Sequence, residues 1–174
     1  MFKFENLDDA TRFSMLKAIE EAEGTGNIYF STRFNLAGNM EWLPLLKQAA
    51  QEFNEHWLAY QLESKKLMKD FEGSRTPSDV YTIKHVPHTA AETMAEGQFN
   101  RFYMLGLCKR ARVEGMTHLE IYRAKERSEP RPESQTLIGN RLSIDEIEIQ
   151  LKEVKASINS RLVKPNSGIC ARIY

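Results

Sequence analysis

The feature that most constrains the fold is an unbroken apolar run, Phe102 to Cys108, inside a segment with helical character at 89–115. Phe99, Phe102 and Leu105 fall on one broad face of such a helix, and Tyr103, Met104 and Leu107 add apolar side chains on other faces. A helix that is apolar nearly all round must be covered by more than one layer. The sequence therefore predicts a central helix, wrapped by the rest of the domain or by another chain.

Apolar periodicity predicts further helices at 7–23, 39–52, 55–69 and 143–158. Ser143 and Glu146 have the spacing of a capping box, which marks the start of the last of these. Pro44 is compatible with a helix only near its beginning, so the second helix should start near Met40. The inward-facing residues are expected to be Leu7, Phe13, Leu16 and Ile19; Trp42, Leu45, Leu46 and Ala49; Trp57, Leu58, Leu62, Leu67 and Met68; Ile144, Ile147, Leu151, Val154 and Ile158.

Alternating side chains predict short strands at 80–86, 118–125 and 169–173, and a weaker strand-like stretch lies at 28–30. The last strand is expected to pair beside residues 118–124. The loop at 126–140 should contain one short turn of helix after Pro132. The predicted fold class is therefore a helix-rich α+β fold, in which N-terminal helices join a C-terminal part with long helices and a small sheet of two or three short strands.

The stretch EGSRTPSD at 72–79 is the best candidate for a boundary, because Gly, Ser, Pro and Asp gather there with almost no apolar content. It divides the chain into an N-terminal helical region at 1–72, a linker at 73–79 and a C-terminal α+β region at 80–174. One continuous domain is the alternative.

Composition bounds the function. Hydrophobic residues make up 41% of the 174 residues, which is typical of a globular chain. Lys plus Arg and Asp plus Glu both number 24, so the chain lacks the basic excess of a dedicated nucleic-acid binder. This balance is compatible with a local basic patch. Two cysteines form no disulfide framework and indicate a reducing compartment. No apolar run approaches a membrane span, so we expect a soluble protein without a membrane partner.

Candidate catalytic residues are few. Cys108 would need a base and an electropositive setting to act as a nucleophile, and burial in the core is the favoured interpretation. His85 and His88 lack companion ligands at a spacing that suits a metal. No glycine-rich phosphate loop is present. We therefore predict no catalytic, cofactor or metal site, no small-molecule substrate and no enzymatic activity.

The basic residues of the central helix and of the following strand and loop form the most prominent charged group: Arg101, Lys109, Arg110, Arg112, Arg123, Lys125, Arg127 and Arg131. Arginine predominates, which favours bidentate pairing with carboxylates or phosphates. An ordinary solvated face of mixed charge is the competing interpretation, because glutamates are interspersed with these residues. The segment 123–133 is a stiffened arm, since Arg131 lies between two prolines.

The C-terminal half resembles a family of uncharacterised proteins encoded in tailed phages and prophages, through AEGQFNRFYMLGLCKRA, EIYRAKERSEPRPESQTLIG and KPNSG. The resemblance covers residues 79–174 best, and its motifs carry no catalytic residue. It implies a virion structural component of the head or neck, made in the host bacterial cytoplasm. Its partners would then be other phage structural proteins, in many copies, with packaged DNA as a further contact.

These observations together predict a non-enzymatic structural subunit of a phage particle, in the capsid shell or the head-to-tail connection, that acts through subunit contacts. Aromatic residues and arginine dominate the energetics of interfaces. The predicted interface residues are Arg123, Arg127, Arg131, Trp42, Trp57, Ile169, Ile173 and Tyr174, with core burial favoured for the two tryptophans. The alternative is a nucleic-acid-binding or regulatory protein that uses the basic patch at 101–131.

Overall fold

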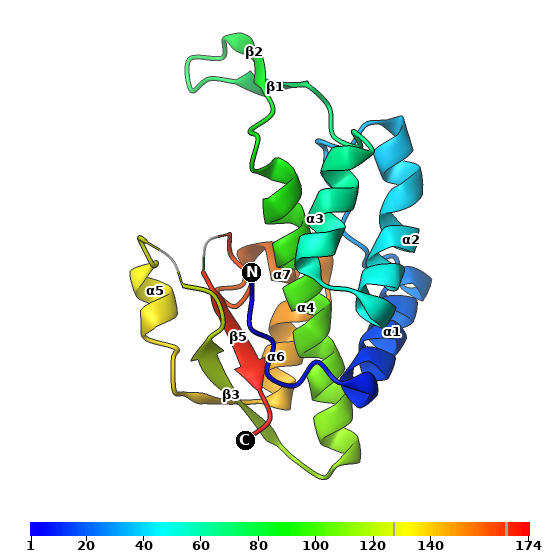
Figure 1. The fold of residues 1–174 in the computed structure, drawn as a ribbon. Helices are drawn as coiled ribbons and strands as arrows, with labels where there is room; N and C mark the ends of the chain where they lie inside the picture. The colour runs from blue at the N-terminus through cyan, green and yellow to red at the C-terminus, as the bar shows by residue number, and fades with distance from the viewer. Residues whose placement is uncertain (127, 166) are drawn as a thin grey trace.

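A computed structural model describes residues 1–126, 128–165 and 167–174 and confirms the helix-rich α+β class (Figure 1). The helices are α1 Asp9–Gly24, α2 Leu36–Glu52, α3 Glu55–Ser64, α4 Ala90–Val113, α5 Pro132–Gln135, α6 Ile144–Leu151 and α7 Val154–Asn159. The strands are β1 Phe71–Arg75, β2 Tyr81–His85, β3 His118–Arg123, β4 Arg141–Ser143 and β5 Ile169–Arg172.

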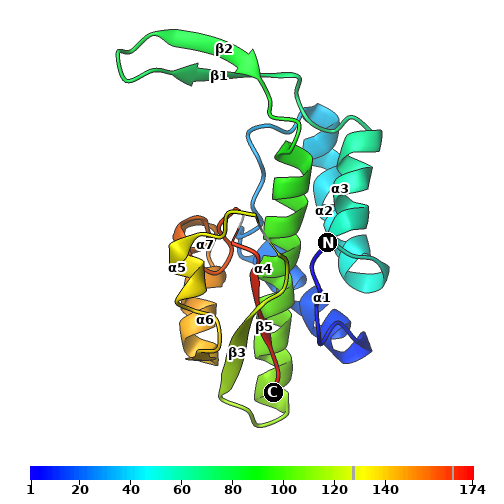
Figure 2. The same ribbon diagram turned by 60° about the vertical axis from the view of Figure 1, so that its left-hand side comes forward.

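Helix α4 runs through the middle of the molecule, as the sequence predicts. In both views α1, α2 and α3 lie on one side of it, and β3, β5 and α6 lie on the other (Figures 1 and 2). Every residue from Phe99 to Cys108 is buried, which is possible because two layers cover the helix. Its wrapping comes from the same chain.

Helices α4 and α1 approach each other closely at a glycine. A Cβ built on Gly106 would lie 2.7 Å from Met15 Cγ and 2.8 Å from Met15 N. Only a residue without a side chain fits there, so the glycine inside the apolar run lets the backbones of the two helices meet. Gly106 therefore permits the close packing of α1 on the central helix at Met15.

The larger sheet has the order β4-β3-β5 and is antiparallel throughout. The predicted pairing of the tail strand is confirmed, since Ile121 lies opposite Ala171 and Tyr122 opposite Cys170. Strand β4 is short and has no clear alternation, and the sequence analysis assigned no strand there. Buried Leu119, Ile121 and Ile169 place this sheet against the core.

The first residues of the chain strap its two halves together. Phe2 N donates to Glu55 Oε1 at 2.7 Å, and Lys3 N donates to the carbonyl of Ala124 at 2.8 Å. Asn6 N then donates to the hydroxyl of Tyr103. One continuous core cluster includes residues from both predicted regions, with α1, α2 and α3 contributing alongside β3, β5 and α6. The boundary at 73–79 therefore separates two segments that share a core.

Several local predictions are wrong. Helix α2 begins at Leu36, where Asn35 caps it by accepting from Gly38 N, and Pro44 lies inside the helix. Phe13 is exposed, because α1 turns Met15, Ala18 and Ile19 toward α4 instead. Residues 28–30 form no strand.

The predicted helix at 143–158 is two helices, α6 and α7, with a break at 152–153. Its first half follows the prediction, because the Ser143–Glu146 capping box is present and Ile144, Ile147 and Leu151 are buried. Its second half does not: Ile158, on α7, is exposed. The predicted linker at 73–79 is the end of β1 and the turn that follows it.

Candidate functional site

A β-hairpin extends away from the helical body and is the most conspicuous surface feature (Figures 1 and 2). It consists of β1 and β2, which pair antiparallel with Phe71 opposite His85 and Arg75 opposite Tyr81. We refer to residues 71–85 as the hairpin arm. Thr76 N donates to the carbonyl of Val80 at 2.9 Å and closes the turn.

The hairpin arm carries its apolar side chains on the outside. Successive side chains of a strand point to opposite faces, so Phe71, Tyr81 and Ile83 share one face. These three residues are 53%, 64% and 69% exposed. Glu72 lies on the other face, and its side chain is only 18% exposed. This distribution is the reverse of an ordinary sheet, which turns its apolar face toward the core.

The polar face is fastened to the body by a bidentate ion pair. Arg33 Nε lies 2.6 Å from Glu72 Oε2, and Arg33 Nη2 lies 3.0 Å from Glu72 Oε1. Hydrogen bonding from Arg33 lowers the pKa of Glu72 below its ordinary value. Lys69 N also donates to the carbonyl of Arg33 at 2.8 Å. These contacts hold the base of the arm in a fixed orientation, with its apolar face turned away from Arg33.

The apolar face of the arm is flat. The ring of Tyr81 lies across Gly73, where a Cβ would come within 1.9 Å of the tyrosine hydroxyl oxygen. At the base of the arm the rings of Phe71 and His85 are in contact, with centroids 4.4 Å apart. The glycine lets the tyrosine lie down on the sheet. The face therefore presents ring surfaces and Ile83, and Arg75 lies near the turn.

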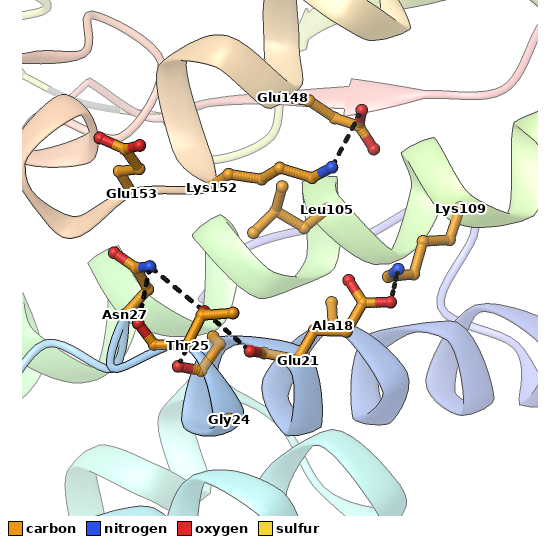
Figure 3. A pocket seen from close by; sticks show the side chains of 11 residues that line it. Ala18, Glu21, Gly24, Thr25, Asn27, Leu105, Lys109, Glu148, Lys152 and Glu153 are labelled. Carbon is orange, nitrogen blue, oxygen red and sulfur yellow. Dashed lines mark hydrogen bonds and ion pairs between the residues drawn. The ribbon is translucent and has the colours of Figure 1, made fainter.

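A pocket of about 640 Å³ lies where α1, α4 and the α6–α7 junction meet. Ala18, Ala22 and Leu105 provide apolar lining. Figure 3 shows the charged residues pairing around it: Lys109 reaches Glu21, and Lys152 reaches Glu148. The Lys109–Glu21 pair joins α4 to α1, and the Lys152–Glu148 pair is local to the end of α6. We assign no ligand to the pocket.

The predicted arginine-rich segment at 123–133 folds back on its own chain. Arg123 Nη1 donates to the carbonyl of Ser167 at 2.7 Å, and Arg131 Nε donates to the carbonyl of Pro165 at 3.0 Å. Lys125, between them, pairs with Glu92 and Glu96 of α4. Arg127 lies outside the described residues. The two described arginines of this segment therefore hold the backbone at Pro165 and Ser167.

The basic residues of α4 are also used within the chain. Arg101 is fully buried and donates to the carbonyls of Leu151 and Lys152 at the end of α6. Burial lowers the pKa of Arg101 to about 10. Arg110 pairs with Asp8 and Glu114, and Arg112 pairs with Asp145 and Glu148. The predicted patch at 101–131 is thus distributed between the core and intramolecular ion pairs.

The other predicted interface residues have different environments. Trp42 is fully buried, and its Nε1 donates to the carbonyl of Tyr29, while Ile169 is buried in the sheet. Trp57 is partly buried and stacks on Phe53 at 4.3 Å between centroids. Ile173 is partly buried, and Tyr174 is exposed beneath the guanidinium of Arg141. Trp42 and Ile169 are therefore core residues, and Tyr174 is accessible.

The candidate reactive residues have environments that oppose reactivity. Cys108 is buried in α4, and desolvation raises the pKa of its thiol to about 12. Within the described ranges, no three or more His, Cys, Asp or Glu side chains gather as a metal site. The same part of the chain contains no helix long and apolar enough to cross a membrane.

Of the hairpin arm, the sequence predicted only the second strand, within the stretch 80–86, and β2 confirms it. Its first strand, FEGSR, reads as a linker because Gly and Ser interrupt it. The usable signal is symmetry: five residues on each side of the turn T-P-S-D-V place Phe71 opposite His85. Comparison with known proteins adds no assignment, because no family model, curated protein or solved structure matches the chain.

Proposed function

We propose that this protein is a non-enzymatic structural subunit that joins a larger assembly through its hairpin arm. The observation that carries the proposal is the outward apolar face of Phe71, Tyr81 and Ile83 on an element fastened to the body through its polar face. Contiguous exposed apolar surface of this kind marks interaction sites. An isolated two-stranded hairpin is marginally stable in water, so cover by a partner stabilises it.

A protein partner fits the arm better than a nucleic acid does. The arm carries two acidic residues, Glu72 and Asp79, and two basic ones, Arg75 and Lys84, so it offers phosphates no net charge. Arg75 and Lys84 each lie within ion-pair distance of a carboxylate of the arm. The basic residues of α4 give the nucleic-acid alternative little support either. Arg101 is buried, and the other described basic residues of this helix already pair with carboxylates.

A phage particle is the assembly that the resemblance of residues 79–174 supports, with a place in the capsid shell or the head-to-tail connection. The partners would then be other structural proteins of the particle. The neutral charge of the chain supports this, because near-neutral subunits repel each other little when they pack. The site of action would be the virion.

The test is co-sedimentation from lysate of the source in the presence of nuclease. The chain should migrate with a heavy, nuclease-resistant particle. A variant without the arm can be built conservatively, because Val86 N donates to the carbonyl of Asp70 at 2.9 Å and the cut ends are adjacent. Residues 71–85 are replaced by Asn-Gly, the preferred two-residue hairpin turn.

The excised variant should keep the thermal stability of the body and disappear from the particle fraction. Recovery of the complete chain only as a free protein of about 20.1 kDa would contradict the structural role. Particle association that survives excision would contradict the role of the arm. Replacement of exposed Lys17 and Glu20 on α1 by Gln serves as the control, and should leave both readouts unchanged.

A further inference from the structure

We infer that the apolar face of the hairpin arm packs on the same face of a second copy of this chain, related to it by a two-fold axis. The inference rests on the proposed function and deepens it, because it names the first partner of the arm. The interface would be two small antiparallel sheets stacked face to face, with Phe71, Tyr81 and Ile83 from each copy between them.

The hairpin arm has one face that is free to meet a partner. Glu72, on the polar face, is held by Arg33, and Lys84 lies 3.6 Å from the same carboxylate. The free surface of the arm is therefore the opposite one, which presents Phe71, Tyr81 and Ile83. Its partner has to be largely apolar, since burying a polar group without a hydrogen bond is unfavourable.

The free face of the hairpin arm is flat. Sheets pack face to face when side chains of similar height meet across a gap of about 10 Å. Gly73 removes one side chain from the face and lets the Tyr81 ring lie flat over the gap. A flat face rich in ring carbon suits another flat sheet better than it suits the ridged surface of a helix.

The free face is also self-complementary. The only basic side chains on the face are Arg75, next to the turn, and His85, at the base beside Phe71. A two-fold axis near Ile83 runs the two arms in opposite directions. The Arg75 guanidinium of one copy, which pairs with Asp79 of its own turn, then lies near the Phe71 ring of the other, where a guanidinium is attracted to a ring face. A two-fold interface requires this match of a patch with its own rotated image.

The experiment is sedimentation velocity of the purified chain over a wide concentration range, with a pair of neighbouring substitutions. Ile83→Lys places a charge in the centre of the proposed interface. Thr82→Lys adds the same charge one residue away, on the opposite face of β2, and both positions are exposed in the monomer. We expect a monomer–dimer equilibrium that Ile83→Lys weakens by about 30-fold or more, the effect of a central hot spot. Thr82→Lys should leave the dissociation constant unchanged.

A cross-linking measurement gives a second readout. Ile83→Cys should form a disulfide-linked dimer under mild oxidation, and Thr82→Cys should not. The native thiols of Cys108 and Cys170 are buried and do not interfere while the chain stays folded. Formation of the disulfide at 83 alone would support the facing arrangement.

Three results would overturn the inference: a monomer at every concentration, a dimer indifferent to Ile83→Lys, or a dimer weakened equally by both lysines. A monomer that binds lipid vesicles through Ile83 would overturn it in favour of a membrane surface. If the purified chain stays monomeric while excision of the arm still removes it from the particle, the arm binds a different subunit. The proposed function then survives and the second copy is rejected.

Discussion

Gly106 shows how one residue fixes the approach of two helices. Any side chain there meets the backbone of Met15, which cannot move aside as a flexible side chain would. We expect Gly106→Ala to lower the free energy of unfolding by about 1–3 kcal/mol, the usual cost of overpacking. Urea denaturation measures this change in the free energy of unfolding.

Gly97 provides the matched control on the same helix. A Cβ at Gly97 meets only the carbonyl oxygen of Val163, at 3.9 Å. Gly97→Ala should therefore raise stability by about 0.5–1 kcal/mol, because alanine loses less backbone entropy than glycine in a helix. Equal effects of the two substitutions would show that helix propensity, and not close approach, explains Gly106.

Glu55 is a buried acid in which one of the two carboxylate oxygens accepts a hydrogen bond. It is 2% exposed; Oε1 accepts from Phe2 N, and Oε2 has no partner among the described residues. Burial raises the pKa of Glu55 in the folded chain. The folded state therefore binds this proton more tightly than the unfolded chain. Its contribution to stability is present below the ordinary pKa of 4.5 and is lost as pH rises through the raised value.

Glu55→Gln removes this dependence and keeps an oxygen for Phe2 N. We expect the stability of the variant relative to the native chain to be more favourable at pH 7 than at pH 4, in urea denaturation over that range. Glu63→Gln, at an exposed position on the same helix, is the control. Parallel pH profiles for the native chain and Glu55→Gln would rule out a raised pKa at this carboxyl group.

Elements were predictable where local signals agree with packing. Ser143 and Glu146 marked the start of α6 because a capping box is a local hydrogen-bond pattern that needs no distant partner. Pro44 misled because the Asn35 cap lies nine residues before it, and the chain tolerates an interior proline in α2. The alternation at 80–86 predicted β2, but its partner β1 was missed because Gly73 and Ser74 interrupt the pattern of that strand.

The arm itself should depend on the Arg33–Glu72 pair. Glu72→Gln removes one charge and the bidentate geometry, which hold the base of the hairpin. We expect faster amide hydrogen exchange at residues 72, 74, 82 and 84, and little change in global stability, as for a partly exposed ion pair. Glu20→Gln, from the exposed Lys17–Glu20 pair, should change neither. Unchanged exchange in the arm would show that backbone pairing alone holds it.

At the scale of the whole molecule, the shared core predicts one cooperative transition. Both tryptophans, Trp42 and Trp57, precede the arm, whereas the buried thiols of Cys108 and Cys170 follow it. Tryptophan fluorescence and pulse labelling of the thiols should give the same urea midpoint. Two separated midpoints would instead mean that 1–72 and 80–174 unfold as independent domains.

The class of the fold followed from residue patterns, and the candidate site did not. The apolar run from Phe102 to Cys108 required a central helix covered on all sides, whichever elements cover it. The placement of Arg110 and Arg112, by contrast, depends on carboxylates distant in sequence, such as Asp8 and Glu148. A basic cluster in the sequence carries no information on which of its charges the fold has already neutralised.

The strap at the start of the chain has a consequence for protein synthesis. Asn6 Oδ1 accepts from Ile173 N, and Glu5 pairs with Arg172, so residues 5–6 are fastened to residues made 167 positions later. Strand β3 also needs β5 as its pairing partner. While residues 169–173 are still in the ribosome, β3 lacks this partner, and the contacts of Asn6 with Ile173 and of Glu5 with Arg172 are absent. Final closure of this fold therefore has to wait until residues 169–173 have left the ribosome, and until then the nascent chain exposes a sheet edge of the kind that chaperones protect.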